Sequence, residues 1–231
     1  MKLPVKYVWT HDAFRVGEDG PTHQPVEQEA QIRLMEQLKN HDGKNSMLVL
    51  RPADAMETTA CWKLALENTI SPTALLLSRQ NIADVPAKPG TTRFQDSLES
   101  AKGAYIVKDS DAEADVVLIA NGSEVSTLLD GAAKLENENG LKIRIVSAPS
   151  EGLFRSQDVS YQESVIPSDK PAFGLTAGLP VTLKGLVGGK GKVVGMESFG
   201  YSAPYKVLDE KFGYTAENVY NQVVSYLEDY K

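Results

Sequence analysis

Short apolar runs alternate with helix-like segments along almost the whole chain, and this alternation restricts the fold more than any other feature. In the first third of the sequence, strand-like runs rich in apolar residues cover Val5–Thr10, Ser46–Pro52 and Thr73–Arg79. The latter two runs are apolar at consecutive positions rather than at every second one. Such strands are typical of a parallel sheet that is covered by helices on both faces.

Helical patterns fill the gaps between these strands. In the segment 25–40, apolar residues recur at helical spacing (Val26, Ala30, Leu34 and Leu38), and Pro25 suits a first helical turn. The segment 55–68 is also helical in pattern, and Asp54 directly before it is a typical N-cap residue. Strand and helix therefore alternate as in an α/β fold.

The alternation stops between Asn81 and Ser100, where two prolines and a polar composition indicate an interdomain linker. A second α/β series follows, with strands predicted in the ranges 103–109, 114–124, 141–150, 170–176 and 190–198. Ser123 is expected to cap a helix that ends at Gly140, and Thr215 to cap the C-terminal helix. We place the first domain at 1–90, the linker at 91–102 and the second domain at 103–231.

Composition excludes several functional classes. The net charge is −7 and basic residues form no run, which argues against nucleic-acid binding. The apolar runs are too short to cross a bilayer, so we expect no membrane span. The single cysteine, Cys61, fits a reducing cytoplasmic location and is expected to be a buried small apolar residue. Trp9 and Trp62 are likewise expected in the core.

The segment Gly17–Gln28 carries the strongest sign of chemistry. It places two carboxylates, a glycine, a proline and a histidine within the six positions 18–23, directly before a helix. In open α/β sheets, ligands bind where strands end, and a helix N-terminus favours anions. Histidine exchanges protons near neutral pH, and a carboxylate accepts hydrogen bonds from hydroxyl groups. Glycine-rich acidic turns are also common, and Asp19 would equally serve as a cap for backbone amides.

Several longer segments make the assignment specific. The stretches YVWTHDAFRVGEDGPTHQPVEQ, LRPADAMET, SPTALLLSRQNI, LIANGSEV, RIVSAPS and MESFGYSAP resemble the corresponding parts of transketolase, a thiamine-diphosphate enzyme of the pentose phosphate pathway. The resemblance covers essentially the whole chain. Deoxyxylulose-phosphate synthases share the Asp-Gly-Pro-Thr-His element, but there the histidine and glutamine are typically followed by glycine. Dihydroxyacetone synthase is a closer alternative.

The resemblance implies roles for four residues. His11 resembles a ligand for the sugar phosphate, and Asp19 the aspartate that reads a hydroxyl of the bound sugar. His23 is similar to the histidine near the cofactor's thiazolium that contacts the reacting oxygens, so it serves both catalysis and cofactor binding. Arg79 resembles the arginine that binds the terminal phosphate. Arginine forms bidentate, charge-assisted pairs with phosphate, which agrees with that role. Gln24 is assigned no role beyond orientation.

The resemblance also implies that parts of the family's site are missing. The family's magnesium and diphosphate site, a Gly-Asp-Gly element followed by an asparagine, is not found in the sequence. The glutamate that activates the cofactor and the aromatic residues that stack on it belong to the first half of the pyrimidine-binding domain. Residues 1–90 therefore resemble a truncated pyrimidine-binding domain that begins at about its fourth strand, and Met1 is expected to be an artificial or accidental start.

The expected fold is therefore α/β with two αβα units and mostly parallel sheets, the second being a transketolase C-terminal domain. We expect the chain to contribute to ketol transfer between sugar phosphates only with the missing N-terminal region, thiamine diphosphate and magnesium, as a homodimer, and to be inactive alone. The alternatives are a non-catalytic dimerisation or interaction module, and a natural subunit of a split transketolase. Residues 1–90 are expected to be poorly ordered alone or to be rescued by dimer contacts.

Overall fold

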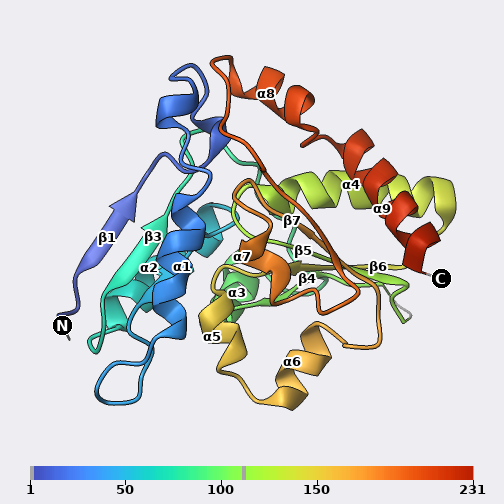
Figure 1. Ribbon diagram of the computed structural model, residues 1–231. Helices are drawn as coiled ribbons and strands as arrows, with labels where there is room; N and C mark the ends of the chain where they lie inside the picture. Colours follow the sequence, from blue (N-terminus) through green and yellow to red (C-terminus); the bar gives the residue numbers. More distant parts are fainter. Residues whose placement is uncertain (1–2, 111–112, 231) are drawn as a thin grey trace.

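The computed structural model describes residues 3–110 and 113–230, so the prediction for Met1 lies outside the described residues. Two α/β units lie next to each other, each built on its own sheet (Figure 1). All strand pairs in the first sheet are parallel, and one pair in the second is antiparallel. The predicted class of two α/β units with mostly parallel sheets is confirmed.

The first unit has a three-stranded sheet in the order β1-β3-β2. Its strands are β1 (Lys6–Trp9), β2 (Leu48–Leu50) and β3 (Thr73–Leu76), and its helices are α1 (Gln28–Gln37) and α2 (Ala55–Glu67). Two short 3₁₀ helices, η1 (Phe14–Val16) and η2 (Pro21–His23), lie between β1 and α1. The side chain of Asp54 accepts a hydrogen bond from the Glu57 amide, which confirms the predicted N-cap of α2.

The apolar core of the first unit is divided into two small clusters. On the side of α2 the buried members are Leu50, Cys61, Ala65 and Leu75. On the side of α1 they are Val49, Ala74 and Leu76. Cys61 is fully buried, as predicted, and this burial raises the pKa of its thiol well above the ordinary value. A thiol with a raised pKa is a poor nucleophile, in agreement with a packing role.

Apolar side chains of the first unit also lie at the surface. Strand β1 pairs with β3 on one side only, and Trp9 on it is 42% exposed, so the prediction of a core position is wrong. Trp62 is partly buried against the α2 cluster. Leu34 in α1 and Leu38 directly after it are 57% and 55% exposed, although they belong to the predicted apolar repeat. Val26, at the other end of the repeat, is buried in the large cluster of the second unit, so only the C-terminal half of the repeat lies at the surface.

The predicted linker contains helical structure. Residues 81–90 are irregular, but α3 (Arg93–Ser97) and η3 (Leu98–Lys102) follow them. Thr92 and Gln95 form a capping box in which each side chain bonds the backbone of the other residue. Ser97 and Ser100 on these helices are fully buried. The apolar pattern is too short here to reveal a helix, whereas the capping pair is visible in the sequence.

The second unit has a five-stranded sheet in the order β4-β6-β5-β7-β8, in which only β4 is antiparallel to its neighbour. The strands are β4 (Tyr105–Lys108), β5 (Val116–Ala120), β6 (Ile143–Ser147), β7 (Ala172–Leu175) and β8 (Lys192–Val194). The helices are α4 (Glu124–Asn139), α5 (Glu151–Arg155), α6 (Val159–Val165), α7 (Val181–Lys184), α8 (Tyr205–Phe212) and α9 (Ala216–Tyr230). Each of the five predicted strand ranges contains one of these strands.

Helices cover both faces of the second sheet. On one face, α4 and α9 pack over side chains of β5, β6 and β7 in a single large cluster that contains Leu118, Ile145 and Phe173. On the other face, α5, α6 and α7 cover alternate residues of the same strands, including Val117 and Val146. This alternation explains why these strands are apolar at consecutive positions.

The predicted helix ends of the second unit agree with the structure at two of three positions. Gly140 has the left-handed conformation and ends α4. Thr215 accepts a hydrogen bond from the Asn218 amide, at an oxygen–nitrogen distance of 3.2 Å. Ser123 precedes α4, but its hydroxyl donates to Glu124 and accepts from Arg15 instead of capping the helix. The predicted Ser123 cap is therefore wrong, because a charged network between the units takes up the hydroxyl.

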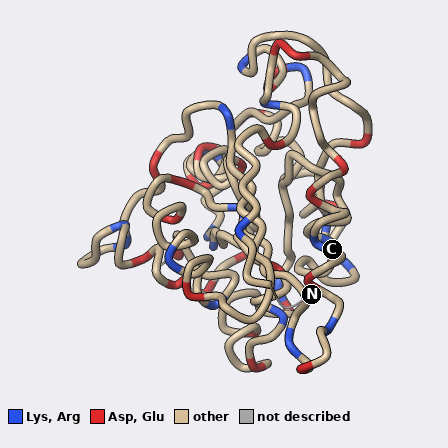
Figure 2. Tube along the Cα trace, turned by 90° about the vertical axis from the view of Figure 1, so that its left-hand side faces the viewer, with Lys and Arg blue, Asp and Glu red and all other residues tan. Residues whose placement is uncertain are grey.

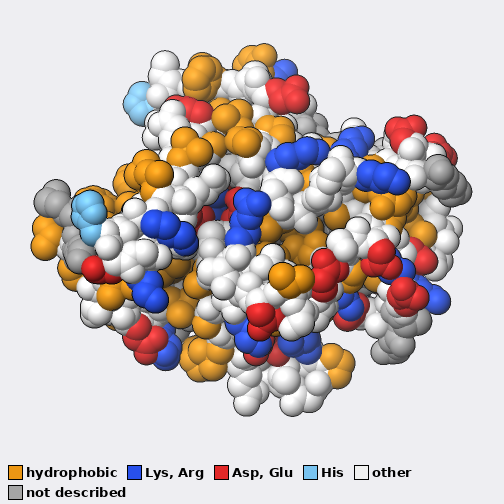
Figure 3. Space-filling model, turned by 60° about the horizontal axis from the view of Figure 1, so that its bottom comes forward, with side chains coloured by type: hydrophobic (Ala, Val, Ile, Leu, Met, Phe, Trp, Pro, Cys, Tyr) orange, Lys and Arg blue, Asp and Glu red, His pale blue; other side chains and the backbone are white. Residues whose placement is uncertain are grey.

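Charges are mixed over both units. Acidic and basic positions are scattered over the trace in Figure 2. On the face drawn in Figure 3, Lys and Arg side chains are interspersed with Asp, Glu and hydrophobic ones. Among residues 3–110 and 113–230, no helix is both long and apolar enough to cross a membrane.

Candidate functional site

The connection between β1 and α1 forms a compact loop against the second unit. Ala13, Gly17 and Gly20 have positive φ angles of 56°, 95° and 77°, which give the chain its sharp turns. Between these turns, the fully buried ring of Phe14 lies 4.7 Å from the ring of Tyr214, centroid to centroid. The loop is therefore anchored by an aromatic side chain of its own in the core of the second unit.

Three of the four predicted site residues lie along this connection and are exposed. His11 follows β1, and its Nδ1 lies 2.8 Å from the hydroxyl of Thr10. Asp19 lies in the turn at Gly17–Gly20, and His23 ends η2. The Nδ1 atom of His23 lies 2.8 Å from the hydroxyl of Thr22. Each histidine thus has one ring nitrogen beside a neighbouring hydroxyl.

The fourth predicted residue, Arg79, comes from the end of β3, the strand next to β1. Its side chain is 46% exposed, and its Nη1 lies 3.7 Å from Oε2 of Glu18, which precedes Asp19. Because β1 and β3 are parallel, their carboxyl ends meet at one edge of the sheet. The structure thereby brings Arg79 beside the turn that carries Asp19.

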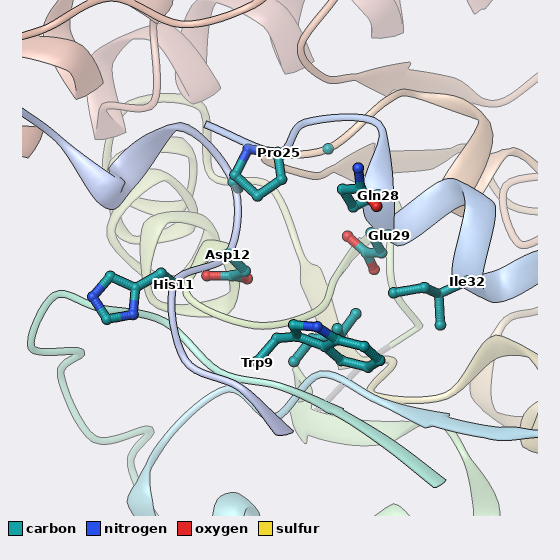
Figure 4. A pocket seen from close by; sticks show the side chains of 10 residues that line it. Trp9, His11, Asp12, Pro25, Gln28, Glu29 and Ile32 are labelled. Carbon is teal, nitrogen blue, oxygen red and sulfur yellow. The ribbon is translucent and has the colours of Figure 1, made fainter. Parts of the chain in front are cut away.

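A cavity of about 320 Å³ opens at the same edge of the first sheet. Its lining includes Trp9, His11 and Asp12 from β1 and the residues after it, and Gln28, Glu29 and Ile32 from α1. In Figure 4, Asp12 lies between His11 and Glu29, with Trp9 below them. Asp19, His23 and Arg79 do not line this cavity. Of the four predicted residues, only His11 lines the cavity.

Behind the cavity, Arg51 connects the site to the second unit. Its side chain is 2% exposed, and its Nε donates to Oδ2 of Asp12 at 2.5 Å. Its Nη1 donates to both oxygens of Asn121 and to Glu124 in the second unit. Arg51 therefore fixes the residue that follows His11 to the start of α4.

Glu124 is shared between two arginines. It is fully buried and accepts hydrogen bonds from Arg51 and from Arg15, the latter at 2.6 Å. Burial by itself raises the pKa of the Glu124 carboxyl, but the two guanidinium groups outweigh that effect and hold the pKa below its ordinary value. Glu124 therefore stays ionised at neutral pH inside the interface between the units.

Helix α1 joins the same interface through its charged face. Arg33 donates to Glu29 at 2.8 Å and to Glu36 at 3.2 Å, and all three side chains are less than a tenth exposed. Glu36 in turn accepts a hydrogen bond from the Ser150 hydroxyl of the second unit at 2.8 Å. Charge contacts, not apolar ones, therefore occupy the inner face of this helix.

Arg51 and Gln24 are the residues that reasoning from the sequence did not assign to the site. Gln24 is 1% exposed, and its side-chain amide donates to the carbonyl oxygens of Gly17 and Tyr201. Neither residue stands out by spacing or by charge pattern. The only sequence signals that include them are the segments quoted above for the family resemblance.

The cofactor that the resemblance implies requires a metal site beside its diphosphate. Magnesium on a diphosphate is usually held by one or two carboxylates together with phosphate oxygens and waters. Among residues 3–110 and 113–230, no group of three or more His, Cys, Asp or Glu side chains is placed to hold a metal ion. The loop with His11, Asp19 and His23 is exposed and holds no such group.

Two families of known domains match the chain, one in each unit. The family described as "Transketolase, pyrimidine binding domain" matches residues 1–84, and the one described as "Transketolase-like TK C-terminal domain" matches residues 103–215. The chain is 44% identical over 222 residues to transketolase 2 of Vibrio parahaemolyticus, which covers 96% of this chain and 31% of that protein.

Solved structures give the same result. The transketolase of Leishmania mexicana superposes with a TM-score of 0.84 at 37% identity, over 98% of this chain and 31% of the other. A transketolase of Pichia stipitis in complex with sedoheptulose 7-phosphate gives a TM-score of 0.82 at 31% identity, over 99% of this chain and 31% of the other. The chain thus spans about a third of the length of these relatives, and it belongs to the transketolase family, of which it carries the pyrimidine-binding and C-terminal domain regions.

Proposed function

We propose that this chain supplies the sugar-phosphate side of a two-carbon ketol transfer between a ketose phosphate and an aldose phosphate. The observation that carries the proposal is the meeting of two loops at the carboxyl ends of β1 and β3. One loop bears His11, Asp19 and His23, and the other places Arg79 beside it, 3.7 Å from Glu18. A related transketolase has been solved with a sugar phosphate, which supports this substrate class.

Each side chain suits one part of such a substrate. The half-exposed side chain of Arg79 is available for a terminal phosphate, to which arginine binds with two parallel hydrogen bonds. His11 adds a second donor to that phosphate. Asp19 accepts a hydrogen bond from a sugar hydroxyl. His23, whose Nε2 is opposite the nitrogen that contacts Thr22, holds or donates a proton at the reacting oxygen.

The cofactor belongs to the larger assembly in this proposal. Thiamine diphosphate supplies the stabilised carbanion of ketol transfer when bound, and magnesium holds its diphosphate. This chain would contribute His23 to the cofactor's surroundings, while the missing N-terminal transketolase region supplies the diphosphate site. The assembly would be a cytoplasmic homodimer of the pentose phosphate pathway, and the chain alone would be inactive.

A ketol-transfer assay tests the proposal. The purified chain is supplied with thiamine diphosphate, magnesium, xylulose 5-phosphate and ribose 5-phosphate, first alone and then with the separately expressed N-terminal portion of a transketolase relative. We expect turnover only in the second mixture, and its loss in His23→Ala. Turnover by the chain alone, clearly above the His23→Ala control, would show that the cofactor is held in some other way.

A second candidate function is a non-catalytic interaction module. It is favoured by the exposed apolar side chains of the first unit, which include Tyr7, Trp9, Leu34 and Leu38. Monomeric proteins seldom expose apolar groups of this size close together. Sedimentation of the chain together with the N-terminal portion discriminates between the two: a stable complex without turnover favours the module, and a stable complex with turnover favours the enzyme.

A further inference from the structure

The loop that carries Asp19 and His23 is held in place by a segment of the second unit. We define the site loop as Gly17–Gln24 and the docking segment as Gly200–Pro204. The Ser202 hydroxyl of the docking segment donates to the carbonyl oxygen of Glu18. In Figure 1 the connection after β1 and the segment before α8 lie together at the top of the molecule. The site loop is thus supported from outside its own sheet.

Gln24 forms the centre of this contact. Its Nε2 donates to the carbonyl oxygen of Gly17 at 2.8 Å and to that of Tyr201 at 2.7 Å. Because both partners are carbonyl oxygens, the amide nitrogen and not the amide oxygen must face them. One side chain therefore joins the beginning of the site loop, its end and the docking segment at a single point.

The amide oxygen of Gln24 lies directly over Gly200. A Cβ atom at position 200 would be 1.3 Å from Oε1 of Gln24, so a larger residue cannot occupy this position unless the amide moves. Oε1 itself is buried and has no hydrogen-bond partner among the described residues. Close approach to a glycine backbone, and not a second hydrogen bond, therefore determines where this end of the amide lies.

His23 has few contacts of its own. Its ring contacts the hydroxyl of Thr22, and its backbone amide donates to the carbonyl oxygen of Gly20 at 3.1 Å. The ring is exposed, so packing does not fix its position. The backbone position of His23 must then follow from the residue next to it, Gln24, which is 1% exposed.

We propose that Gln24 and Gly200 form a positioning pair through which the second unit sets the location of His23. The inference deepens the proposed function, on which it rests, because it gives the C-terminal domain region a part in the geometry of the sugar-phosphate site. Gln24 is not proposed to contact the substrate. It acts through the backbone of the site loop.

The test uses the full chain and nuclear magnetic resonance of its three histidine rings. Gly200→Ala places a methyl group where the Gln24 amide lies and leaves the site loop unmutated. Gly189→Ala is the matched control, since a Cβ at position 189 meets nothing within 4 Å. His41, in the turn after α1, serves as the internal reference.

We expect Gly200→Ala to shift the ring signals of His23 and to leave those of His41 in place. Loss of the two hydrogen bonds of the Gln24 amide should also speed the hydrogen exchange of the His23 backbone amide by about tenfold or more. Gly189→Ala should change neither readout. Unchanged His23 signals in Gly200→Ala, or equal shifts at His23 and His41, would overturn the inference.

Gln24→Ala gives an independent measurement if Gly200→Ala folds poorly. It removes the amide, so a methyl group at position 200 then has room. The double variant should therefore show the same His23 signals as Gln24→Ala alone, whereas independent residues would give additive shifts. Additive shifts would show that the two positions do not act as a pair.

Titration with xylulose 5-phosphate separates this inference from the proposed function. In the wild-type chain we expect the His23 signals to move on titration, and to move less in Arg79→Ala. We expect Gly200→Ala to weaken the binding of xylulose 5-phosphate at least threefold, a change of the size expected for the loss of one hydrogen bond. If the His23 signals of the wild type do not move on titration, the proposed function is overturned. The positioning pair is then tested by the His23 signals and hydrogen exchange of the chain without sugar. Equal binding by wild type and Gly200→Ala would overturn the positioning role alone.

Discussion

The two units of this chain are built by the same alternation of strand and helix but are held together by different forces. In the second unit one continuous apolar cluster joins α4 and α9 to the sheet. In the first unit two clusters of four and three buried residues lie on either face of a short sheet. This difference indicates that the first unit depends on its contacts with the second unit for much of its stability.

Those contacts are partly apolar, since Phe14 and Val26 of the first unit belong to the large cluster, and partly charged. Arg51, Arg15 and Glu124 are buried between the units, together with the charged face of α1. Buried ion pairs are stable only when every member has a partner. Removal of one member of this network therefore leaves its partners in the first unit uncompensated, while the second unit relies on many apolar contacts.

The largest expected effect is the loss of Arg51. Arg51→Leu leaves Asp12 and Glu124 without their main partner and should lower the free energy of unfolding by about 3–5 kcal/mol. Urea unfolding followed by circular dichroism measures it. Lys63→Ala is the control, because the Lys63–Glu67 pair is 58% exposed at both ends and should contribute less than about 1 kcal/mol. Equal effects of the two variants would contradict the network.

Paired core truncations test the difference in packing. Leu118 and Leu75 are both fully buried, the first in the large cluster and the second in the four-residue cluster. Each Leu→Ala change should cost about 2–5 kcal/mol, with Leu118→Ala nearer the upper limit because its rigid surroundings cannot collapse. Hydrogen exchange shows where the loss falls. Leu75→Ala should expose amides of the first unit only, and exposure throughout the chain would show that the units unfold as one.

The pH dependence of stability tests Glu124, whose folded pKa is lowered below its ordinary value of 4.5. Its contribution is fully present above the unfolded pKa and is lost as the pH falls below 4.5 through the folded pKa. The difference in free energy of unfolding between wild type and Glu124→Gln should therefore be constant near neutral pH and shrink below pH 4.5. A difference that stays the same down to pH 3 would mean that Glu124 is not the titrating group.

The smallest effect is expected on the outer face of α1. Leu34 is 57% exposed, so Leu34→Gln should change the free energy of unfolding of the free chain by less than about 0.5 kcal/mol. In a homodimer, or in a complex with an N-terminal region, the same change should weaken association. Sedimentation of both proteins measures this. An effect above 1 kcal/mol on the free chain would show that the residue is buried in solution.

The positions of the strands and helices followed well from pattern, but the strand order and the burial of individual side chains did not. A helix is correctly expected in the segment 25–40, but α1 begins at Gln28 and not in a first turn at Pro25. Its buried residues are Glu29, Arg33 and Glu36 rather than apolar ones. A hydrophobic repeat indicates which residues share a face, but it does not indicate whether that face meets the rest of this chain. The same limit explains the exposed Trp9.

The sequence proposes the candidate site as a set of residues but does not give their arrangement. His11, Asp19 and His23 lie between positions 11 and 23, and their position after a strand gives the local geometry. The placement of Arg79 next to them depends on the strand order β1-β3-β2. The role of Gln24 depends on a segment more than 170 residues away, since the separation from Tyr201 is 177 residues.

By itself, the sequence determined the α/β class, the two units, the helix ends at Asp54, Gly140 and Thr215 and the family, because periodicity, capping residues and short motifs are local properties. Only the tertiary structure decided which face of α1 is buried, that Ser123 joins an ion network instead of capping α4, and that Gly200 supports the site loop. These features arise from contacts between distant segments. The free energy of such a contact depends on which groups meet and on how completely both are removed from water. Neither can be read from a local sequence pattern.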